Sequence, residues 1–435
     1  MVSEITDENT IDTILEVYSD YLDNLTDPRT GSPLNLTSRA ARVHAMNVGL
    51  YQPEVLLVWG QDISFSQLDI YLPWIKRSRY RVGIICKSLK GKSLSVLEVG
   101  NTPIYTHLKK TSPNISLGAS GSLRGMLYIS EKMANFNYVK SWPHVTHVFP
   151  NHGDSDKHSS SSRTTMIYDF AFVADGRSMS RFMNAGMDMS PERFLLVGGA
   201  VVDGVEAVTS GATGSRKFLY APTWEGHSDV VNFSSVGKVD ESIEKATEHA
   251  AFRFRPHPGL GTRLTDIAKS RDSIKRSMEP RSTKADDFNW ADVLIADNSG
   301  VISEFLFTRK PIIVPVPNDW VGEYVRSTDL RDFAYLWDYV STPFEEIKEL
   351  VAQDPLRESR VRRANQLYDG IESADDSARL FDRALDYISL HTEFKQRRAG
   401  TGVTSGTPTV PAVRVPRRVS RAVSAVSSGA AVLRI

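Results

Sequence analysis

The chain has 435 residues, of which 41% are hydrophobic and 24% are charged, and its formal net charge is +0. This composition is typical of a globular protein, and the length is enough for two or three domains. One cysteine excludes an internal disulfide and a Cys/His zinc site, and no apolar run approaches the roughly 18 residues that a membrane-spanning helix needs.

The N-terminal segment "MVSEITDENT" is acidic and has neither the basic nor the apolar region of a signal peptide. We therefore expect a cytoplasmic protein. The single cysteine, Cys86, lies in the apolar run "RVGIICKS", where a buried strand residue is expected. A reducing compartment is consistent with this usage.

The first half of the chain predicts helices and then a series of strands. Residues 1–50 have apolar residues at helical spacing, as in "TIDTILEVYSDYLDNL". Short apolar runs follow, several of them separated by helical stretches such as "GRSMSRFMNAGM". The predicted strands are 54–60, 81–88, 144–149, 169–175 and 193–199. Short buried strands that alternate with helices indicate a parallel α/β sheet.

A second series of strands begins after the small, polar segment 203–216, "DGVEAVTSGATGSR", which we take as a domain boundary. The predicted strands of this series are 217–223, 249–258, 291–300 and 311–317, and residues 342–393 are predicted to form closing helices. The fold class is therefore α/β, with two Rossmann-like domains facing a cleft. The predicted limits are 1–205, 206–395 and a basic flexible tail, 396–435.

The tail contains seven arginines and no acidic residue. Its remaining residues are mostly small or polar, which predicts disorder in solution. Val419, Val423 and Val426 fall on one helical face beside arginines, so residues 414–434 could bind an anionic membrane surface. A solvated tail is the alternative. If residues 414–434 bind the membrane, we expect the protein to be peripheral on its inner face.

Unusual polar residues follow several predicted strands. In open α/β sheets, ligands bind beyond the carboxyl ends of the strands. His152-Gly153, Thr223, His257 and Ser299-Gly300 occupy such positions. Small, polar or cationic groups at four strand ends predict a cleft built for an anion.

The segment 291–313, "ADVLIADNSGVISEFLFTRKPII", predicts a buried strand that leads through Asp297 into a helix. Ser299 and Gly300 then lie at the helix N-terminus, where free backbone N–H groups bind phosphate. Glu304, about one turn further, is positioned to accept hydrogen bonds from a ribose. The alternative is an ordinary capped helix, with Asp297 or Ser299 as the N-cap.

Two further segments carry candidate donor-binding residues. In "FRFRPHPG", Arg253, Arg255 and His257 end a strand, and a rigid imidazole and guanidinium suit a diphosphate. The alternative is a surface turn with exposed basic residues. In "LYAPTWEG", Thr223 is a candidate phosphate contact, whereas Trp224 is expected to pack.

The loop in "FPNHGDSDKHSSSSR" begins directly after a strand. His152 is a candidate general base, with room for the backbone at Gly153. Asp154 or Asp156 is positioned to orient this imidazole, and Lys157 to contact a phosphate. The histidine spacing matches no metal-ligand motif, so we expect no metal and no cofactor.

Taken in order, "NHGDSDK", "YAPTW", "RPHP" and "ADVLIADNSGVISEFLFTRKPII" resemble the motifs of the CDP-glycerol glycerophosphotransferase family, which contains the teichoic-acid primases and polymerases. They span residues 149–317, and no motif matches before about residue 140. The resemblance implies a two-domain glycosyltransferase-B fold. Its N-terminal domain faces the acceptor, and its C-terminal domain holds the nucleotide.

The resemblance also implies residue roles and partners. His152 is then the base, His257 binds the diphosphate, and the segment with Ser299, Gly300 and Glu304 binds phosphate and ribose. The implied donor is CDP-glycerol or a related nucleotide-activated compound, and the implied acceptor is lipid-linked or polymeric. CMP would leave, and no nucleic-acid partner is expected.

The sequence departs from the family pattern at two positions of the predicted donor site. Gly300 follows Ser299 where the family often has a second serine, and Glu225 follows "PTW" where the family often has arginine. Two alternatives therefore stay open. One is a sugar-nucleotide glycosyltransferase or 2-epimerase on the same fold. The other is a non-catalytic module that binds a glycan or a nucleotide.

Overall fold

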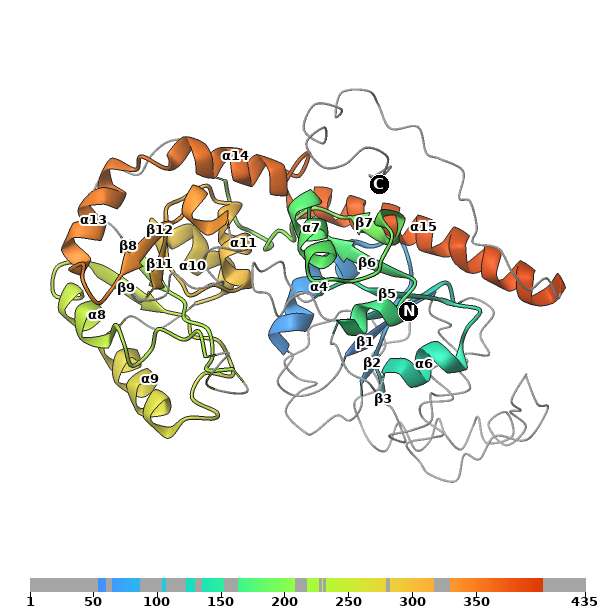
Figure 1. The fold of residues 1–435 in the computed structure, drawn as a ribbon, viewed down its shortest axis with the longest axis horizontal. Coiled ribbons are helices and arrows are strands. Elements are labelled where there is room, and N and C mark those ends of the chain that lie inside the picture. Colours follow the sequence, from blue (N-terminus) through green and yellow to red (C-terminus); the bar gives the residue numbers. More distant parts are fainter. Residues whose placement is uncertain are drawn as a thin grey trace, which may run out of the picture.

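The computed structural model shows two parallel β-sheets with helices packed on them, which form two lobes (Figure 1). The structure describes residues 54–59, 65–86, 104–106, 123–129, 135–151, 163–207, 217–226, 229, 232–278, 282–316 and 329–401. The helices predicted within residues 1–50, the loop after Asn151 and the chain after Thr401 lie outside these ranges.

The first sheet has seven strands in the order β3-β2-β1-β4-β5-β6-β7, and every pair of neighbours is parallel. Its strands are β1 (Val55–Trp59), β2 (Val82–Cys86), β3 (Ile104–Thr106), β4 (Gly125–Tyr128), β5 (Thr146–Phe149), β6 (Phe170–Val173) and β7 (Phe194–Leu196). The helical segments described before residue 200 are α4 (Phe65–Arg77), α6 (Asn135–Ser141), η2 (Arg163–Ile167), α7 (Gly176–Asn184) and η3 (Pro191–Arg193).

Both faces of the first sheet are buried, which explains the continuous apolar runs of its strands. In β1, Val55 and Leu57 join one core cluster, and Leu56 and Val58 join another on the opposite face. Successive side chains of a strand point to opposite faces, so an uninterrupted apolar run fills two cores at once.

The second sheet has five parallel strands in the order β12-β11-β10-β8-β9. They are β8 (Lys217–Tyr220), β9 (Ala251–Phe254), β10 (Val293–Ile295), β11 (Ile312–Val316) and β12 (Tyr335–Asp338). The helices described in this half are α8 (Asp240–Ala246), α9 (Thr265–Ser277), α10 (Lys284–Trp290), α11 (Gly300–Leu306), η5 (Asp329–Asp332), α13 (Phe344–Gln353), α14 (Arg357–Leu367) and α15 (Ala374–Thr401).

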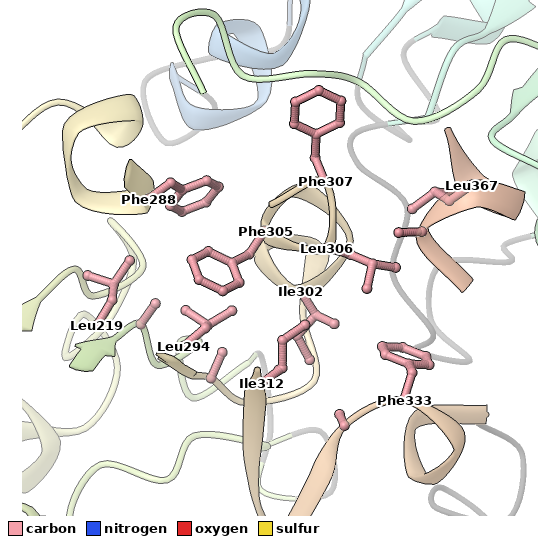
Figure 2. Packing of buried hydrophobic residues seen from close by; sticks show 14 of the residues in the cluster. Leu219, Phe288, Leu294, Ile302, Phe305, Leu306, Phe307, Ile312, Phe333 and Leu367 are labelled. Atoms are coloured by element: carbon pink, nitrogen blue, oxygen red, sulfur yellow. The ribbon is translucent and has the colours of Figure 1, made fainter. Parts of the chain in front are cut away.

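The helix α11 lies in the middle of one core of the second sheet (Figure 2). Its Phe305 and Ile302 pack toward Leu219 of β8 and Leu294 of β10. Phe288 of α10 closes the same cluster and meets the Phe305 ring edge-on, with 5.2 Å between centroids. This packing sets the position of the α11 N-terminus relative to the strand ends.

Within the described residues, the chain passes between the two lobes twice, and the two passages lie against each other. The backbone N–H of Gly199 donates to the carbonyl of Leu367 at 3.0 Å. A Cβ on Gly199 would collide with the Tyr368 ring, so only glycine allows this approach. Beside it, Arg363 of α14 forms a buried ion pair with Asp175, which caps α7.

The last described helix, α15, packs on the first sheet although it follows all of the second sheet in sequence (Figure 1). Phe381 of α15 stacks on Trp74 of α4 with 4.8 Å between ring centroids, and Ile388 completes the same core. The Trp74 indole N–H donates to the Ser377 hydroxyl at 2.7 Å. The first lobe is therefore built from both ends of the described chain.

The predicted fold class, two α/β units with parallel sheets, is confirmed. Strands β3, β4 and β12 were not predicted from the sequence, because all three are only three or four residues long and β4 begins with Gly125. The predicted domain limits remain predictions. Helix α15 starts within the segment assigned to the second domain and ends at Thr401, inside the segment assigned to the tail.

Gly198 offers a test of the passage between the lobes. It has φ +72, and a Cβ there would collide with the Ile371 side chain. We expect Gly198→Ala to lower the free energy of unfolding by about 1 to 2 kcal/mol for the left-handed backbone, plus about 1 to 3 kcal/mol for overpacking. Urea denaturation measures this change.

Gly370→Ala is the matched control. Gly370 has φ +74, but a Cβ at this position would meet no atom of the described residues within 4 Å. The variant should therefore show only the backbone cost. Equal losses in the two variants would contradict the close packing of Gly198.

Candidate functional site

The carboxyl ends of three neighbouring strands bring the candidate residues of the second sheet together. Ile295 of β10 and Phe254 of β9 both pair in register with Tyr220 of β8, so the three strands end level. Just beyond these ends lie Ser299, Thr223 and His257. This is the edge at which parallel α/β sheets bind ligands.

Asp297 ties two segments of this edge together. Its side chain is buried, and Oδ2 accepts from the backbone N–H of Thr223 at 2.7 Å, while Oδ1 accepts from that of Ser235 at 3.2 Å. Thr223 is itself 3% exposed. The Asp297 carboxylate therefore positions Thr223. Contacts of Asp297 and Thr223 with a nucleotide-activated donor substrate stay predictions.

Ser299 is the N-cap residue of α11, with extended backbone at φ −157, and Gly300 is the first residue of the helix. The Ser299 hydroxyl forms no cap hydrogen bond within the described chain. The preceding Asn298 is 3% exposed, and its Nδ2 has no hydrogen-bond partner among the described residues. A buried donor without an acceptor costs about 1 to 3 kcal/mol, which is unusual in a folded protein.

Glu304, the predicted ribose-binding residue, is held by a lysine that the sequence analysis did not single out. Lys284, the first residue of α10, lies with Nζ 3.1 and 3.3 Å from the two carboxylate oxygens of Glu304. Both side chains are partly exposed. The ion pair fixes the direction of the carboxylate, and a ribose contact by Glu304 stays a prediction.

Arg255 donates to groups inside the lobe. Its Nε donates to Oδ2 of Asp287 at 2.6 Å, and another of its guanidinium nitrogens donates to the carbonyl of Ser282. Asp287 is fully buried and also forms an ion pair with Arg253 at 3.1 Å. The guanidinium of Arg253 lies over the Trp290 ring. A buried carboxylate between two guanidinium groups holds α10 against β9.

A hydrogen bond at one ring nitrogen and stacking on one ring face fix the orientation of the His257 imidazole. Its Nδ1 accepts from the backbone N–H of Gly259 at 3.0 Å, so the neutral imidazole carries its proton on Nε2. The ring also stacks on Trp224, with 6.0 Å between centroids and 18° between planes. The backbone N–H of His257 donates to the carbonyl of Pro222 at 2.9 Å. The imidazole therefore presents Nε2–H as a donor in a set orientation.

Glu225, where the family resemblance predicts arginine, is fully buried. Its Oε1 accepts from the backbone N–H groups of Arg263 and Leu264 at 2.7 and 3.0 Å, and Oε2 accepts from Gly261 at 2.8 Å. Burial alone would raise the pKa of this carboxyl, but the backbone N–H groups hold the pKa below its ordinary value. The Glu225 carboxylate is thus hydrogen-bonded to the backbone of the segment that follows His257.

The described part of the other candidate segment ends at Asn151. This buried residue follows β5 and has φ 66, a left-handed conformation that asparagine tolerates. The buried hydroxyl of Tyr71, on α4, donates to the carbonyl of Pro150 at 2.7 Å and to that of Asn151. Tyr71 anchors the point where the predicted loop begins, and no sequence signal pointed to it.

The predicted residues of that loop lie outside the described ranges. They are His152, Gly153, Asp154, Asp156 and Lys157. Their roles stay predictions. Within the described ranges, no group of three or more His, Cys, Asp or Glu side chains could hold a metal ion, and no helix is long and apolar enough to span a membrane.

Comparison with protein families adds to this geometry. Residues 199–384 match the family described as CDP-glycerol:poly(glycerophosphate) glycerophosphotransferase. The match covers the second sheet and all of the candidate residues at its carboxyl edge. No curated protein matches the chain.

Solved structures resemble the two-lobed arrangement. The Anabaena protein Alr3699/HepE, solved in complex with UDP and glucose, has a TM-score of 0.51 at 11% identity, over 77% of this chain and 99% of that one. The wall teichoic acid polymerase TagF has a TM-score of 0.49 at 16% identity, over 82% of this chain and 98% of that one. The likeness to HepE supports the predicted glycosyltransferase-B type of fold.

The lowered pKa of Glu225 makes a pH-dependent contribution to stability. A carboxyl whose pKa is lowered by folding stabilises the protein above its ordinary pKa and loses this effect as the pH falls through the lowered value. We expect Glu225→Gln to reduce the free energy of unfolding most near neutral pH. The gap to the wild type should shrink below about pH 4.

Denaturant unfolding over a range of pH values measures this gap. Glu241→Gln, at an exposed position of α8, is the control and should show little change. A gap for Glu225→Gln that is the same at every pH would contradict the ionised, N–H-bonded state of Glu225.

Proposed function

We propose that the chain, whose residues 199–384 match the CDP-glycerol:poly(glycerophosphate) glycerophosphotransferase family, acts as a member of that family. It would transfer glycerol phosphate, or a similar alditol phosphate, from a CDP-activated donor to an acceptor hydroxyl. Membership of the family implies a transferase with a nucleotide-activated donor and a polymer acceptor. The identity of the alditol and the release of CMP belong to the proposal.

The observation that carries the proposal is the set of hydrogen-bond donors at the ends of three strands that end level with one another. Ser299, after β10, is the N-cap residue of α11, Thr223 follows β8, and His257 follows β9 with its proton on Nε2. A diphosphate needs several convergent N–H and O–H donors, and a helix N-terminus adds positive potential. Such a set suits the diphosphate of a nucleotide-activated donor.

Two further contacts support this assignment. Asn298 is buried directly before Ser299, and its Nδ2, which no described residue accepts, would be satisfied by an acceptor oxygen of a ligand. Lys284 already fixes the carboxylate of Glu304, which suits a residue that must meet two ribose hydroxyls. Arg255, committed to Asp287 and Ser282, would act on the phosphates through its charge.

In the proposed reaction, an acceptor hydroxyl attacks the phosphorus that bears glycerol. His152 takes the hydroxyl proton, a new P–O bond forms to the acceptor, and the bond to the CMP oxygen breaks. The charge that develops on the departing CMP is stabilised by His257 and the start of α11. Positioning and electrostatics carry such a phosphoryl transfer.

CMP release is the direct test. The purified protein is incubated with CDP-glycerol, with and without a glycerol-phosphate primer or a membrane fraction. We expect acceptor-dependent release, reduced about a hundredfold or more by His257→Ala and by His152→Ala, as for a lost transition-state donor or base.

His249→Ala is the matched control, because this exposed histidine lies before the amino end of β9 whereas His257 follows its carboxyl end. It should leave the rate unchanged. Nucleotide release from CDP-ribitol or a UDP-sugar, but not from CDP-glycerol, would leave the fold assignment intact and identify a different donor substrate. Nucleotide binding without turnover for every donor would favour the non-catalytic alternative.

We further propose that the chain binds an anionic membrane surface. The basic segment 414–434 motivates this proposal, and the end of α15 supports it. There, Leu390 and Phe394 are 64% and 38% exposed on the same side of the helix, and the Arg398 guanidinium lies over the Phe394 ring. Exposed apolar residues beside arginines suit the headgroup region of an anionic bilayer.

Vesicle sedimentation tests this proposal. The full chain should bind phosphatidylglycerol vesicles more tightly than phosphatidylcholine vesicles, and added salt should weaken the binding. A chain that ends at Thr401 keeps α15 and should lose most of this preference. Unchanged vesicle binding after the deletion would show that the tail is not the segment that binds the membrane.

A further inference from the structure

Glu225 connects two segments that both touch His257. It directly follows Trp224, which stacks on the His257 ring. Its carboxylate accepts the backbone N–H groups of Gly261, Arg263 and Leu264. These donors lie 36 to 39 residues further along the chain, so the contact joins the β8 end to the β9 end.

The segment that Glu225 binds also orients His257. Nδ1 of the imidazole accepts from Gly259 N–H, and the His257 carbonyl accepts from Leu260 N–H at 2.9 Å. A Cβ on Gly259 would lie 3.3 Å from Nδ1 and 3.4 Å from the Trp224 ring, so the backbone passes close to both rings. Any shift of this turn therefore moves the imidazole.

Helix capping alone explains only part of the arrangement. Leu264 is the N-cap residue of α9 and its side chain forms no cap hydrogen bond there, so Oε1 of Glu225 stabilises that helix start. Oε2, however, binds the turn itself at Gly261. Gly261 has φ +76, and a Cβ there would lie 2.8 Å from the Cα of Ala268. The turn thus has one close-packed conformation, and the second oxygen holds it there.

We propose that Glu225 is a positioning residue, which holds the turn 257–264 so that His257 presents Nε2–H to the phosphate of the donor. This inference rests on the proposed function for the identity of that donor. Where the family resemblance predicts an arginine after "PTW", this chain has an ionised carboxylate that is stabilised by backbone N–H groups. The chain then relies on an oriented imidazole instead of an added cation at this position.

The test compares Glu225→Gln with Glu225→Asp by two readouts in the full-length protein. The glutamine keeps the size but turns an N–H₂ group toward backbone N–H donors, whereas the aspartate keeps the charge on a shorter side chain. The first readout is the rate of CMP release. We expect Glu225→Gln to lower kcat about tenfold or more while KM changes less, and Glu225→Asp to recover part of the loss.

The second readout needs no turnover. Ring-nitrogen NMR shifts of His257, assigned by their loss in His257→Asn, report the tautomer and the hydrogen bond at Nδ1. We expect the wild type to show the Nε2–H tautomer with a bonded Nδ1, and Glu225→Gln to lose this signature. Gly259→Ala, which crowds the ring without touching Glu225, should disturb the same signals.

Asp169→Asn is the control for general destabilisation. Asp169 accepts the backbone N–H of His147 at 2.7 Å and pairs with Lys395, in the other lobe. It should lower the melting temperature without changing kcat or the His257 signals. Unchanged His257 signals in Glu225→Gln would overturn the inference, whatever its melting temperature. Absent CMP release by the wild type would count against the proposed function, while the NMR comparison still decides the role of Glu225.

Discussion

Because β10, β8 and β9 pair in parallel and end level, the chain leaves each of them at the same edge of the sheet. Every candidate group of the second lobe depends on this alignment. The α11 N-terminus follows β10, Thr223 follows β8, and His257 follows β9. An antiparallel neighbour would send its carboxyl end to the opposite edge. The packing of Phe305 between β8, β10 and α10 keeps the helix start in place.

Acidic side chains at this edge are used to organise the backbone. Asp297 binds two backbone N–H groups, Glu225 binds three, and Asp287 binds two guanidinium groups. All three are buried. The dipoles of these N–H groups and the guanidinium charges stabilise the carboxylates as anions and partly offset their field on an anionic ligand. The acidic residue after "PTW" is therefore compatible with a diphosphate site.

Much of the fold could be predicted from the sequence because buried parallel strands leave long apolar runs, as in β1 and β11. Strand β4 could not, since its Gly125 is required by the side chain of Ile388, far away in sequence. The helical pattern of α15 likewise does not say which sheet it covers. At the site, motif positions located His257 and Ser299. The roles of Glu225, Lys284 and Tyr71 depend on partners 20 to 80 residues away, which no local pattern reveals.

The position of α15 also constrains the order of events during synthesis. The strands of the first lobe leave the ribosome first, but Phe381 and Ile388, which complete their core, are made only after the whole second sheet. Until then the apolar face around Trp74 lacks the cover that α15 gives it, and such a surface invites aggregation or chaperone binding. The second lobe has all its described strands and α14 earlier in the chain. Although encoded later, it is thus the first of the two that can close its core without waiting for a distant segment.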